Sequence, residues 1–149
     1  MPGLFPTAGL VAEAWAADVL EAARLGLVLP DKASWAGPQG YFVTRRVMPG
    51  SASHPDQPIA LPVVTFDVWA ANLNSTKPLW ATAAVIAGML HERTFIPNTS
   101  PELSILKPGY RAVNLLEAQC VSEPSEVPED PSGYAHIALD VAFDYAVLP

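Results

Sequence analysis

The segment Pro62–Leu90, PVVTFDVWAANLNSTKPLWATAAVIAGML, predicts a strand, a polar turn and a helix in direct succession. Val63–Ala70 is rich in β-branched and aromatic residues, a composition typical of strands. In the turn, Ser75 is the expected N-cap of the helix, and Pro78 falls in the first turn, where proline is tolerated. We expect the helix to run to about Arg93. This unit lies at the centre of the predicted fold.

The predicted helix is apolar on nearly every side. Its main stripe is formed by Leu79, Ala83, Ile86 and Leu90, while Trp80 and small or apolar residues fill the other sides. A helix of this kind is covered on more than one side. We therefore expect it either to be central in the domain or to be covered by another subunit.

The rest of the chain predicts one more helix and three more strands. The helix covers 7–25, and the strands cover 41–48, 110–121 and 134–147. The resulting order α-β-β-α-β-β predicts an α+β fold, a mainly antiparallel sheet with two helices packed on one face. Shared strand faces and the helix stripe predict a core that contains Phe66, Val68, Ile86, Leu90, Leu139, Val141 and Phe143.

Length and composition favour a single globular domain spanning 1–149, since half of the residues are apolar. Long loops are expected at 50–61, 94–108 and 122–133. No apolar run is long enough to predict a membrane span, and no basic segment precedes the first apolar residues as in a signal peptide. Cys120 is the single cysteine, which excludes an internal disulfide.

Charge is distributed unevenly along the chain. All eight basic residues lie before residue 112, together with eight of the fifteen acids, so the net charge of −7 comes from the C-terminal part. A surface without Lys or Arg does not bind nucleic acid through phosphate contacts. Two interpretations remain open, a solvated acidic surface or a negative surface past which DNA moves without sticking.

The search for chemistry finds no catalytic motif. The histidines His54, His91 and His136 are not at metal-ligand spacing, and neither a nucleophile elbow nor a phosphate-binding loop is present. Asp140 and Asp144 share a strand face, where contact with solvent or a subunit is a better interpretation than acid–base catalysis. We expect no enzyme activity, no metal and no cofactor.

The adjacent basic residues Arg45 and Arg46 are placed on opposite faces of their strand by alternation. The pair is too short a run to indicate nucleic-acid binding. We expect one of the two side chains to be solvated and the other to be paired with an acid.

The order of elements resembles that of the tail terminator, or tail completion, proteins of long-tailed bacteriophages. The similarity rests on the first helix LVAEAWAADVLEAARL, the strand GYFVTRRVMPG, the strand ending FDVWA, the alanine-rich helix STKPLWATAAVIAGML, and the last two strands. The acidic insertion at 122–133 is longer than the hairpin that such a protein would have.

This resemblance implies a structural virion protein without enzymatic activity or cofactor. The family forms a ring, commonly a hexamer, that caps the head-proximal end of the tail tube and joins it to the head. The implied partners are other copies of the chain, the tail tube protein and the head-completion or connector protein. Genomic DNA would pass through the bore without specific binding, and no membrane would be involved. The implied location is the virion neck, with the host cytoplasm as the site of assembly.

Two alternatives stay open, another phage neck protein such as a head-closure or connector component, and a small α+β enzyme or ligand-binding domain. Under the structural interpretation, loops 50–61 and 94–108 contact other subunits, and part of the acidic C-terminal half faces the lumen. The candidate interaction residues are Arg45, Arg46, His54, Asp56, Trp69, Trp80, Glu126, Glu129, Asp130, Asp140 and Asp144.

Overall fold

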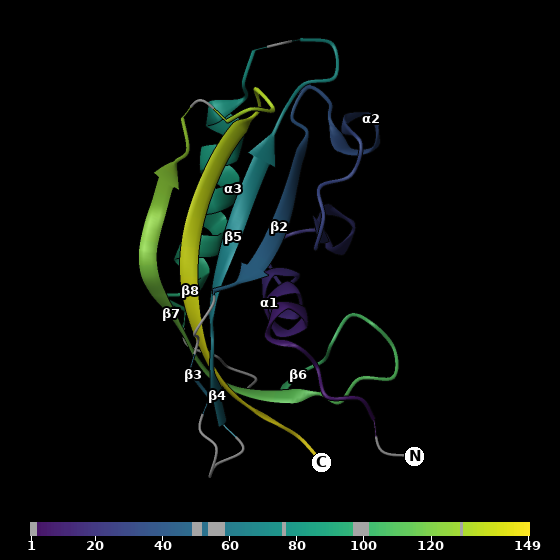
Figure 1. The fold of residues 1–149 in the computed structure, drawn as a ribbon, viewed down its shortest axis with the longest axis vertical. Coiled ribbons are helices and arrows are strands. Elements are labelled where there is room, and N and C mark those ends of the chain that lie inside the picture. The colour runs from purple at the N-terminus through teal and green to yellow at the C-terminus, as the bar shows by residue number, and fades with distance from the viewer. Residues whose placement is uncertain (1–2, 49–51, 54–58, 76, 97–101, 129) are drawn as a thin grey trace.

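The fold is taken from a computed structural model, which describes residues 3–48, 52–53, 59–75, 77–96, 102–128 and 130–149. In these residues, one eight-stranded sheet is combined with three α-helices and a short 3-10 helix. Figure 1 shows four strands, β7, β8, β5 and β2, side by side, with helix α3 running along them. The sheet curls, so that its two faces have different surroundings.

The strand β8 is the centre of the sheet. It pairs with β5 and β4 on one side and with β7 on the other. Strand β2 follows β5, and β1, β3 and β6 are short edge additions. All pairs are antiparallel except β1 with β2. The strands are β1 (Leu25–Gly26), β2 (Tyr41–Val47), β3 (Ala52–Ser53), β4 (Ile59–Leu61), β5 (Val63–Ala70), β6 (Glu102–Leu103), β7 (Val113–Glu126) and β8 (Ala135–Val147).

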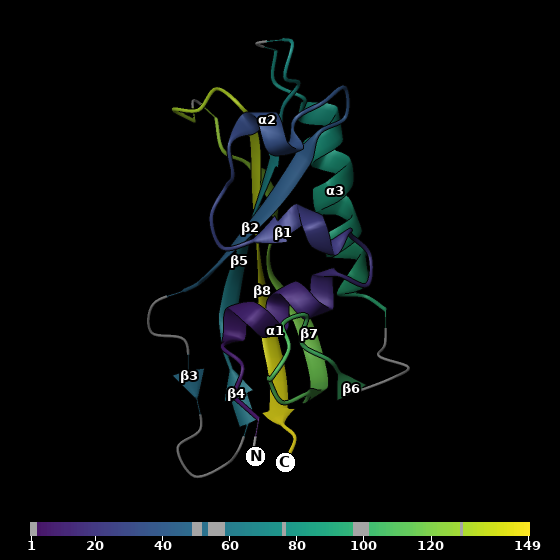
Figure 2. The same cartoon turned by 90° about the vertical axis from the view of Figure 1, so that its right-hand side faces the viewer.

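The helices are α1 (Ala8–Ala16), the 3-10 helix η1 (Ala22–Arg24), α2 (Lys32–Trp35) and α3 (Trp80–Arg93). Thr7 caps α1 by accepting a hydrogen bond from the Leu10 amide through its side-chain oxygen. Helix α3 is tied to α1 by Arg93, which donates to the Trp15 carbonyl at 3.0 Å and pairs with Asp18. Figure 2 shows α1 and α2 at different levels along the sheet, on the side where β1 and β2 lie.

The core lies between α1, α3 and one face of the sheet, which we call the inner face. Trp15 of α1 packs against Phe66 and Phe143, with ring centroids 5.8 and 5.2 Å away. Aromatic pairs at these separations add to the stabilisation from burial. Every residue of the predicted core is buried, which confirms the assignment of strand faces and of the α3 stripe.

The opposite face, which we call the outer face, has its own small apolar cluster. Trp35 of α2 is buried there with Phe42 and Ala71. Its indole donates to the Pro30 carbonyl at 3.0 Å, which holds α2 in place. Helices therefore lie on both faces of the sheet.

The predicted fold class is wrong. The structure is a mixed α/β fold with a curled sheet, and its helices do not pack on one face in the order α-β-β-α-β-β. Helix α2 and the short strands β1, β3, β4 and β6 lie in segments without a clear apolar period. The parallel pairing of β1 with β2 makes the sheet mixed. Short elements of this kind are formed by tertiary contacts, which propensity and periodicity do not encode.

The first helix is also shorter than the predicted range 7–25. It ends at Ala16, and the chain then turns so that Leu20 joins the same core. Two segments expected as loops contain strands, β3 and β4 within 50–61 and β6 within 94–108. Strand β7 continues through 122–126, with register shifts, so that the turn before β8 is confined to 127–134.

Candidate functional site

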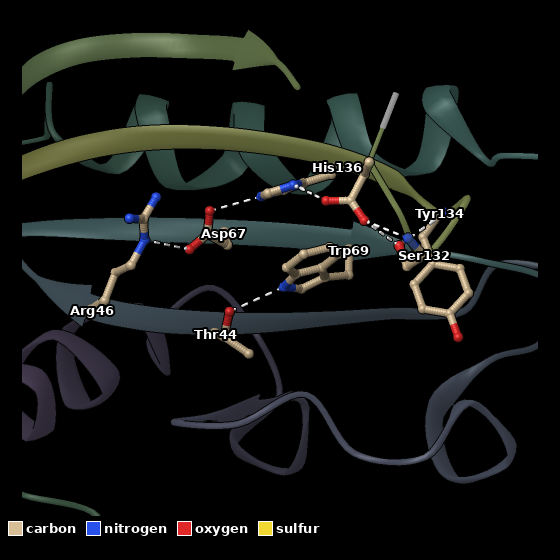
Figure 3. Close-up of polar contacts among 8 residues, drawn as sticks. Thr44, Arg46, Asp67, Trp69, Ser132, Tyr134 and His136 are labelled. Carbon is tan, nitrogen blue, oxygen red and sulfur yellow. Dashed lines mark hydrogen bonds and ion pairs between the residues drawn. The ribbon is translucent and has the colours of Figure 1, made fainter. Parts of the chain in front are cut away.

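The outer face of the sheet carries a row of charged side chains from three strands and one turn (Figure 3). Arg46 comes from β2, Asp67 from β5, His136 from β8, and Asp130 from the turn between β7 and β8. In the antiparallel register, Thr44 of β2 stands opposite Asp67 of β5. Trp69 of β5 stands opposite His136 of β8, so that the three strands lie side by side at this point. Alternation then directs the charged residues to one face.

The row is continuous through hydrogen bonds. Arg46 Nε donates to Asp67 Oδ2 at 3.0 Å. His136 Nε2 lies 2.7 Å from Asp67 Oδ1, and His136 Nδ1 lies 3.0 Å from Asp130 Oδ2. We call Arg46, Asp67, His136 and Asp130 the outer-face network. Its charges alternate in sign when the imidazole is protonated.

Burial makes these contacts strong. The side chains of Asp67 and His136 are only 8% and 9% exposed, whereas that of Arg46 is 67% exposed. Charged groups taken out of water need partners, and each buried member of the network has them. The network is therefore anchored inside the protein and ends in solvent at Arg46.

The two acids of the network have lowered pKa values. Burial would raise the pKa of Asp67, but hydrogen bonds and charge interactions with His136 and Arg46 outweigh it. The pKa of Asp130 is also raised by burial and lowered more strongly by Ser132 and His136. Both carboxylates therefore remain ionised at neutral pH.

The histidine is shifted in the opposite direction. Burial would lower the pKa of His136, but its hydrogen bonds to Asp67 and Asp130, and their charges, raise it above the ordinary value. The ring also stacks on Trp69, with centroids 3.9 Å apart and an angle of 18° between the planes. An aromatic face favours a cation, so that this contact supports the protonated form. Trp69 is held in turn by its indole, which donates to Thr44 Oγ1 at 3.0 Å.

The geometry does not suit acid–base catalysis by His136. A general base needs a ring nitrogen within reach of a substrate proton. Here both ring nitrogens already lie against carboxylates. The arrangement instead joins three strands to a turn and holds a charge.

Of the predicted interaction residues, the structure brings Arg46, Trp69 and Asp130 together in or beside this network. Asp140 lies next to it on the same face, where it accepts a hydrogen bond from Thr65 at 2.5 Å. Asp140 and Arg46 also line one shallow hollow of the outer face. Asp144 lies farther along β8, and one of its carboxylate oxygens is buried without a hydrogen bond.

The remaining predicted residues are elsewhere. Trp80 packs at the edge of the core at the start of α3, and Glu126 is exposed at the end of β7. His54, Asp56 and Glu129 lie outside the described residues. Arg45 is on the inner face, with Nε 3.7 Å from Oε1 of the buried Glu13 of α1. One arginine was expected to be paired and the other solvated, but both have an acidic partner, and Arg46 is the exposed one.

The sequence did not predict that two members of the network, Asp67 and His136, belong to one site. Each of them could have been singled out from the sequence, because it is an ionisable residue within a strand of apolar and aromatic neighbours. Their meeting depends on the pairing of β5 with β8, which are far apart in the chain. Strand pairing of this kind is not contained in the local pattern.

A second candidate surface lies on the outside of α3. Ala81, Ala84, Val85 and Met89 are exposed along one side of the helix and form what we call the α3 strip. Val85 is 62% exposed. Beside the strip, a hollow of about 320 Å³ is lined by Gln39 and Tyr41, among others. Beyond the end of the helix, Phe95 and Ile96 are also exposed. Exposed apolar side chains that lie together on one helix side make this strip a candidate interaction surface.

Further features of the described residues concern the requirements of a metal site, a membrane span and an activated thiol. In them, no three His, Cys, Asp or Glu side chains are grouped so that they could hold a metal ion. None of the described helices has the length and apolar character needed to cross a membrane. The pKa of Cys120 is raised by burial and by nearby Glu123 and Asp140, the opposite of an activated thiol.

No protein-family model matches the chain. No curated protein matches it either.

Proposed function

We propose that this chain is a structural subunit of a closed homo-oligomeric ring in the neck of a long-tailed bacteriophage, where it acts as the tail terminator. The observation that carries the proposal is the α3 strip, an apolar helix surface that the subunit itself leaves uncovered. The other side of the same helix, with Ile86 and Leu90, is buried in the core. A neighbouring subunit would cover the strip and complete the burial of the helix.

The energetic reason is the apolar area. Removing apolar surface from water contributes roughly 25 cal/mol per Å². Val85 and Met89, with the small side chains of Ala81 and Ala84, form a surface that a helix or a sheet edge from another copy can approach closely. Phe95 and Ile96, just beyond the helix, are further exposed apolar side chains. Contacts of this type are repeated around a closed ring, since each subunit uses two different surfaces.

The resemblance of the sequence to tail terminators supports the biological setting. It favours a hexamer whose faces meet the tail tube protein and the head-completion or connector protein. It also favours a location in the virion, after assembly in the host cytoplasm. No catalytic step or cofactor is part of this function.

The exposed acids of β7 fit the passage of DNA. Glu117, Glu123 and Glu126 are exposed along this strand. Carboxylates repel the phosphates of DNA and cannot make the contacts to them that Lys and Arg make. A bore lined by carboxylates would therefore leave DNA free to move. Asp130 and Asp140 contribute less to such a surface, because they are bonded to His136 and Thr65.

The proposal is tested by the oligomeric state in solution. The wild-type protein should form one closed oligomer by size-exclusion chromatography with light scattering. Val85→Glu combined with Met89→Glu should yield a folded monomer, with an unchanged circular dichroism spectrum. Val28→Glu is the matched control, because Val28 is 73% exposed and lies outside α3. A wild-type monomer at all concentrations, or an oligomer in the double variant, would contradict the proposal.

A head-closure or connector component would form a ring through the same strip. Pull-down with purified tail tube protein separates the two, since a tail terminator binds the end of the tube. An oligomer that binds only the head connector would assign the chain to the head side of the neck.

A further inference from the structure

We propose that protonated His136 is a latch that fastens the turn between β7 and β8 to the outer face of the sheet, and that loss of its proton releases the turn. The proposal does not depend on the oligomeric state. It follows from the positions of the two ring nitrogens and from the elements that their partners belong to.

The geometry requires two protons on the ring. Nε2 lies 2.7 Å from an oxygen of Asp67, and Nδ1 lies 3.0 Å from an oxygen of Asp130. An ionised carboxylate only accepts hydrogen bonds, and a neutral imidazole has a single N–H to donate. With a neutral ring, one of the two contacts would set a nitrogen lone pair against a carboxylate oxygen. Both contacts are favourable only when His136 is an imidazolium.

The two carboxylates are on different parts of the molecule. Asp67 lies in the middle of β5, deep in the sheet, and is held from the other side by Arg46. Asp130 lies in the turn, where its Oδ1 accepts hydrogen bonds from the amide and the hydroxyl of Ser132. The imidazolium is therefore the link between the sheet and the turn, and Asp130 is the residue through which the turn is organised.

Other charged groups around the ring do not replace this link. From β7, Glu126 is exposed and stands opposite Ile137, on the neighbouring position of β8. From α2, the Lys32 ammonium lies over the Tyr134 ring, 5.6 Å from its centroid. Arg46 reaches the network only through Asp67. Among the described residues, Asp67 and Asp130 are the two acids bonded to the ring.

The direction of the pH effect follows from the pKa shifts. When the turn is latched, the effect of burial is outweighed by Asp67 and Asp130, which raise the pKa of His136. Release of the turn removes the contribution of Asp130 while Asp67 stays in place, so that the pKa has a lower value in the free state. The latched state therefore holds its proton to higher pH than the free state does. Between these two values, release of the turn also releases one proton, so the opening constant increases by up to roughly tenfold per pH unit. Above the raised value it becomes constant.

Acid acts on the same link from the other side. The pKa of Asp130 is lowered in the latched turn, and protonation of its carboxylate removes the acceptor for His136. The turn should thus be held most firmly at mildly acidic to neutral pH. Strong acid and moderate alkali should both release it.

The test is amide hydrogen exchange of the turn as a function of pH, read by NMR and expressed as protection factors. The reporter amides are those of Ser132, Gly133 and Val127, which are bonded to Asp130 or to the His136 carbonyl. Their protection should fall by tenfold or more as the pH rises from 6 to 9, while amides of β5 remain protected. In the same samples, the ring nitrogen resonances of His136 should show both nitrogens protonated at pH 6.

Two variants and one control separate the latch from ordinary turn stability. Asp130→Asn keeps an oxygen for the Ser132 amide but removes the charge, so that protection should be low and independent of pH between 6 and 9. His136→Gln should behave in the same way. Glu126→Gln, next to the turn but outside the network, should behave as wild type.

Protection that stays constant in the wild type between pH 6 and 9 would overturn the proposal, as would a singly protonated His136 ring at pH 6. Should His136→Gln fail to fold, the wild-type titration and Asp130→Asn still decide the matter. Asp130→Asn with the pH profile of the wild type would also overturn it.

Discussion

Arg45 and Arg46 are neighbours in the chain, yet they lie on opposite faces of the same sheet in opposite surroundings. Arg45 lies under α1 beside Glu13, and both side chains are nearly inaccessible. Arg46 bonds to Asp67 with most of its own side chain in water. Both arginines thus have an acidic partner. On the inner face the pair is buried, whereas on the outer face the arginine forms the solvent-exposed end of a network.

The difference teaches that surroundings, and not the ion pair itself, determine what a charge does here. On the inner face, Glu13 is the acid that lies beside Arg45, and Arg45 Nε has no hydrogen bond within the described residues. A buried charge of this kind must keep its partner or destabilise the fold. On the outer face, the network of charged residues reaches solvent and includes a histidine, so that its net charge can change with pH. The inner pair is nearly closed to solvent, whereas the outer-face network holds a group that can titrate.

The largest expected effect contrasts two neighbours on β8. Leu139 is buried on the inner face, and Leu139→Ala should lower the free energy of unfolding by about 2–5 kcal/mol, through lost burial and the cavity. Asp140→Ala, which removes the acceptor of Thr65 on the outer face, should cost only about 1 kcal/mol. Urea denaturation measures both. A smaller loss for Leu139→Ala than for Asp140→Ala would break the assignment of the faces.

The second effect contrasts the two ion pairs. Glu13→Gln leaves Arg45 buried without a countercharge and should cost about 3 kcal/mol. Arg46→Gln leaves Asp67 bonded to His136, and should cost at most about 1 kcal/mol because Arg46 is exposed. Thermal and urea unfolding of the two variants give the comparison. Equal losses would show that burial of the inner pair has no special cost.

The third effect is the pH dependence of Asp67→Asn, which should cost about 2 kcal/mol at its maximum, the value of a hydrogen bond to a charged group. The pKa of Asp67 is lowered in the fold, so its contribution is present above the ordinary value of about 3.8 and is lost as the pH falls through the folded value. The pKa of His136 is raised, so its contribution is present below about 6.5 and is lost as the pH rises through the folded value.

The difference in stability between wild type and Asp67→Asn should therefore be largest between about pH 4 and 6.5 and should shrink on both sides. Unfolding curves from pH 3 to 9 measure it. Glu13→Gln is the control for a pair without a histidine. A difference that does not vary with pH would separate Asp67 from the titration of His136.

The smallest expected effect on folding concerns exposed acids that are not packed against either face of the sheet. Glu123→Lys with Glu126→Lys should change the free energy of unfolding by no more than about 0.5 kcal/mol, since both residues are exposed. If β7 lines the bore of the proposed ring, phage particles with this variant should retain DNA or eject it slowly. Normal ejection from particles that contain the variant would place β7 on the exterior.

The sequence predicted what periodicity controls and missed what distant pairing controls. Alternation assigned the inner-face positions of β5 and β8 correctly, as the burial of Phe66 and Leu139 confirms. It could not show that β8 lies between β5 and β7, because strand order depends on contacts between distant segments. For the same reason the contact of Asp67 with His136 was not predicted. Helix α2 was not predicted, because a single helical turn around Trp35 is too short to show an apolar periodicity.

The repeated arginine also has a consequence for the alignment of β2 with β5. A shift of β2 by one residue against β5 would exchange its two faces, yet an arginine would still point to each side. Charge alone therefore distinguishes the two alignments poorly. The penalty would fall on Val43, which would leave the core for the outer face while Thr44 entered it. The correct alignment of β2 is therefore specified by the burial of Val43 more than by either arginine.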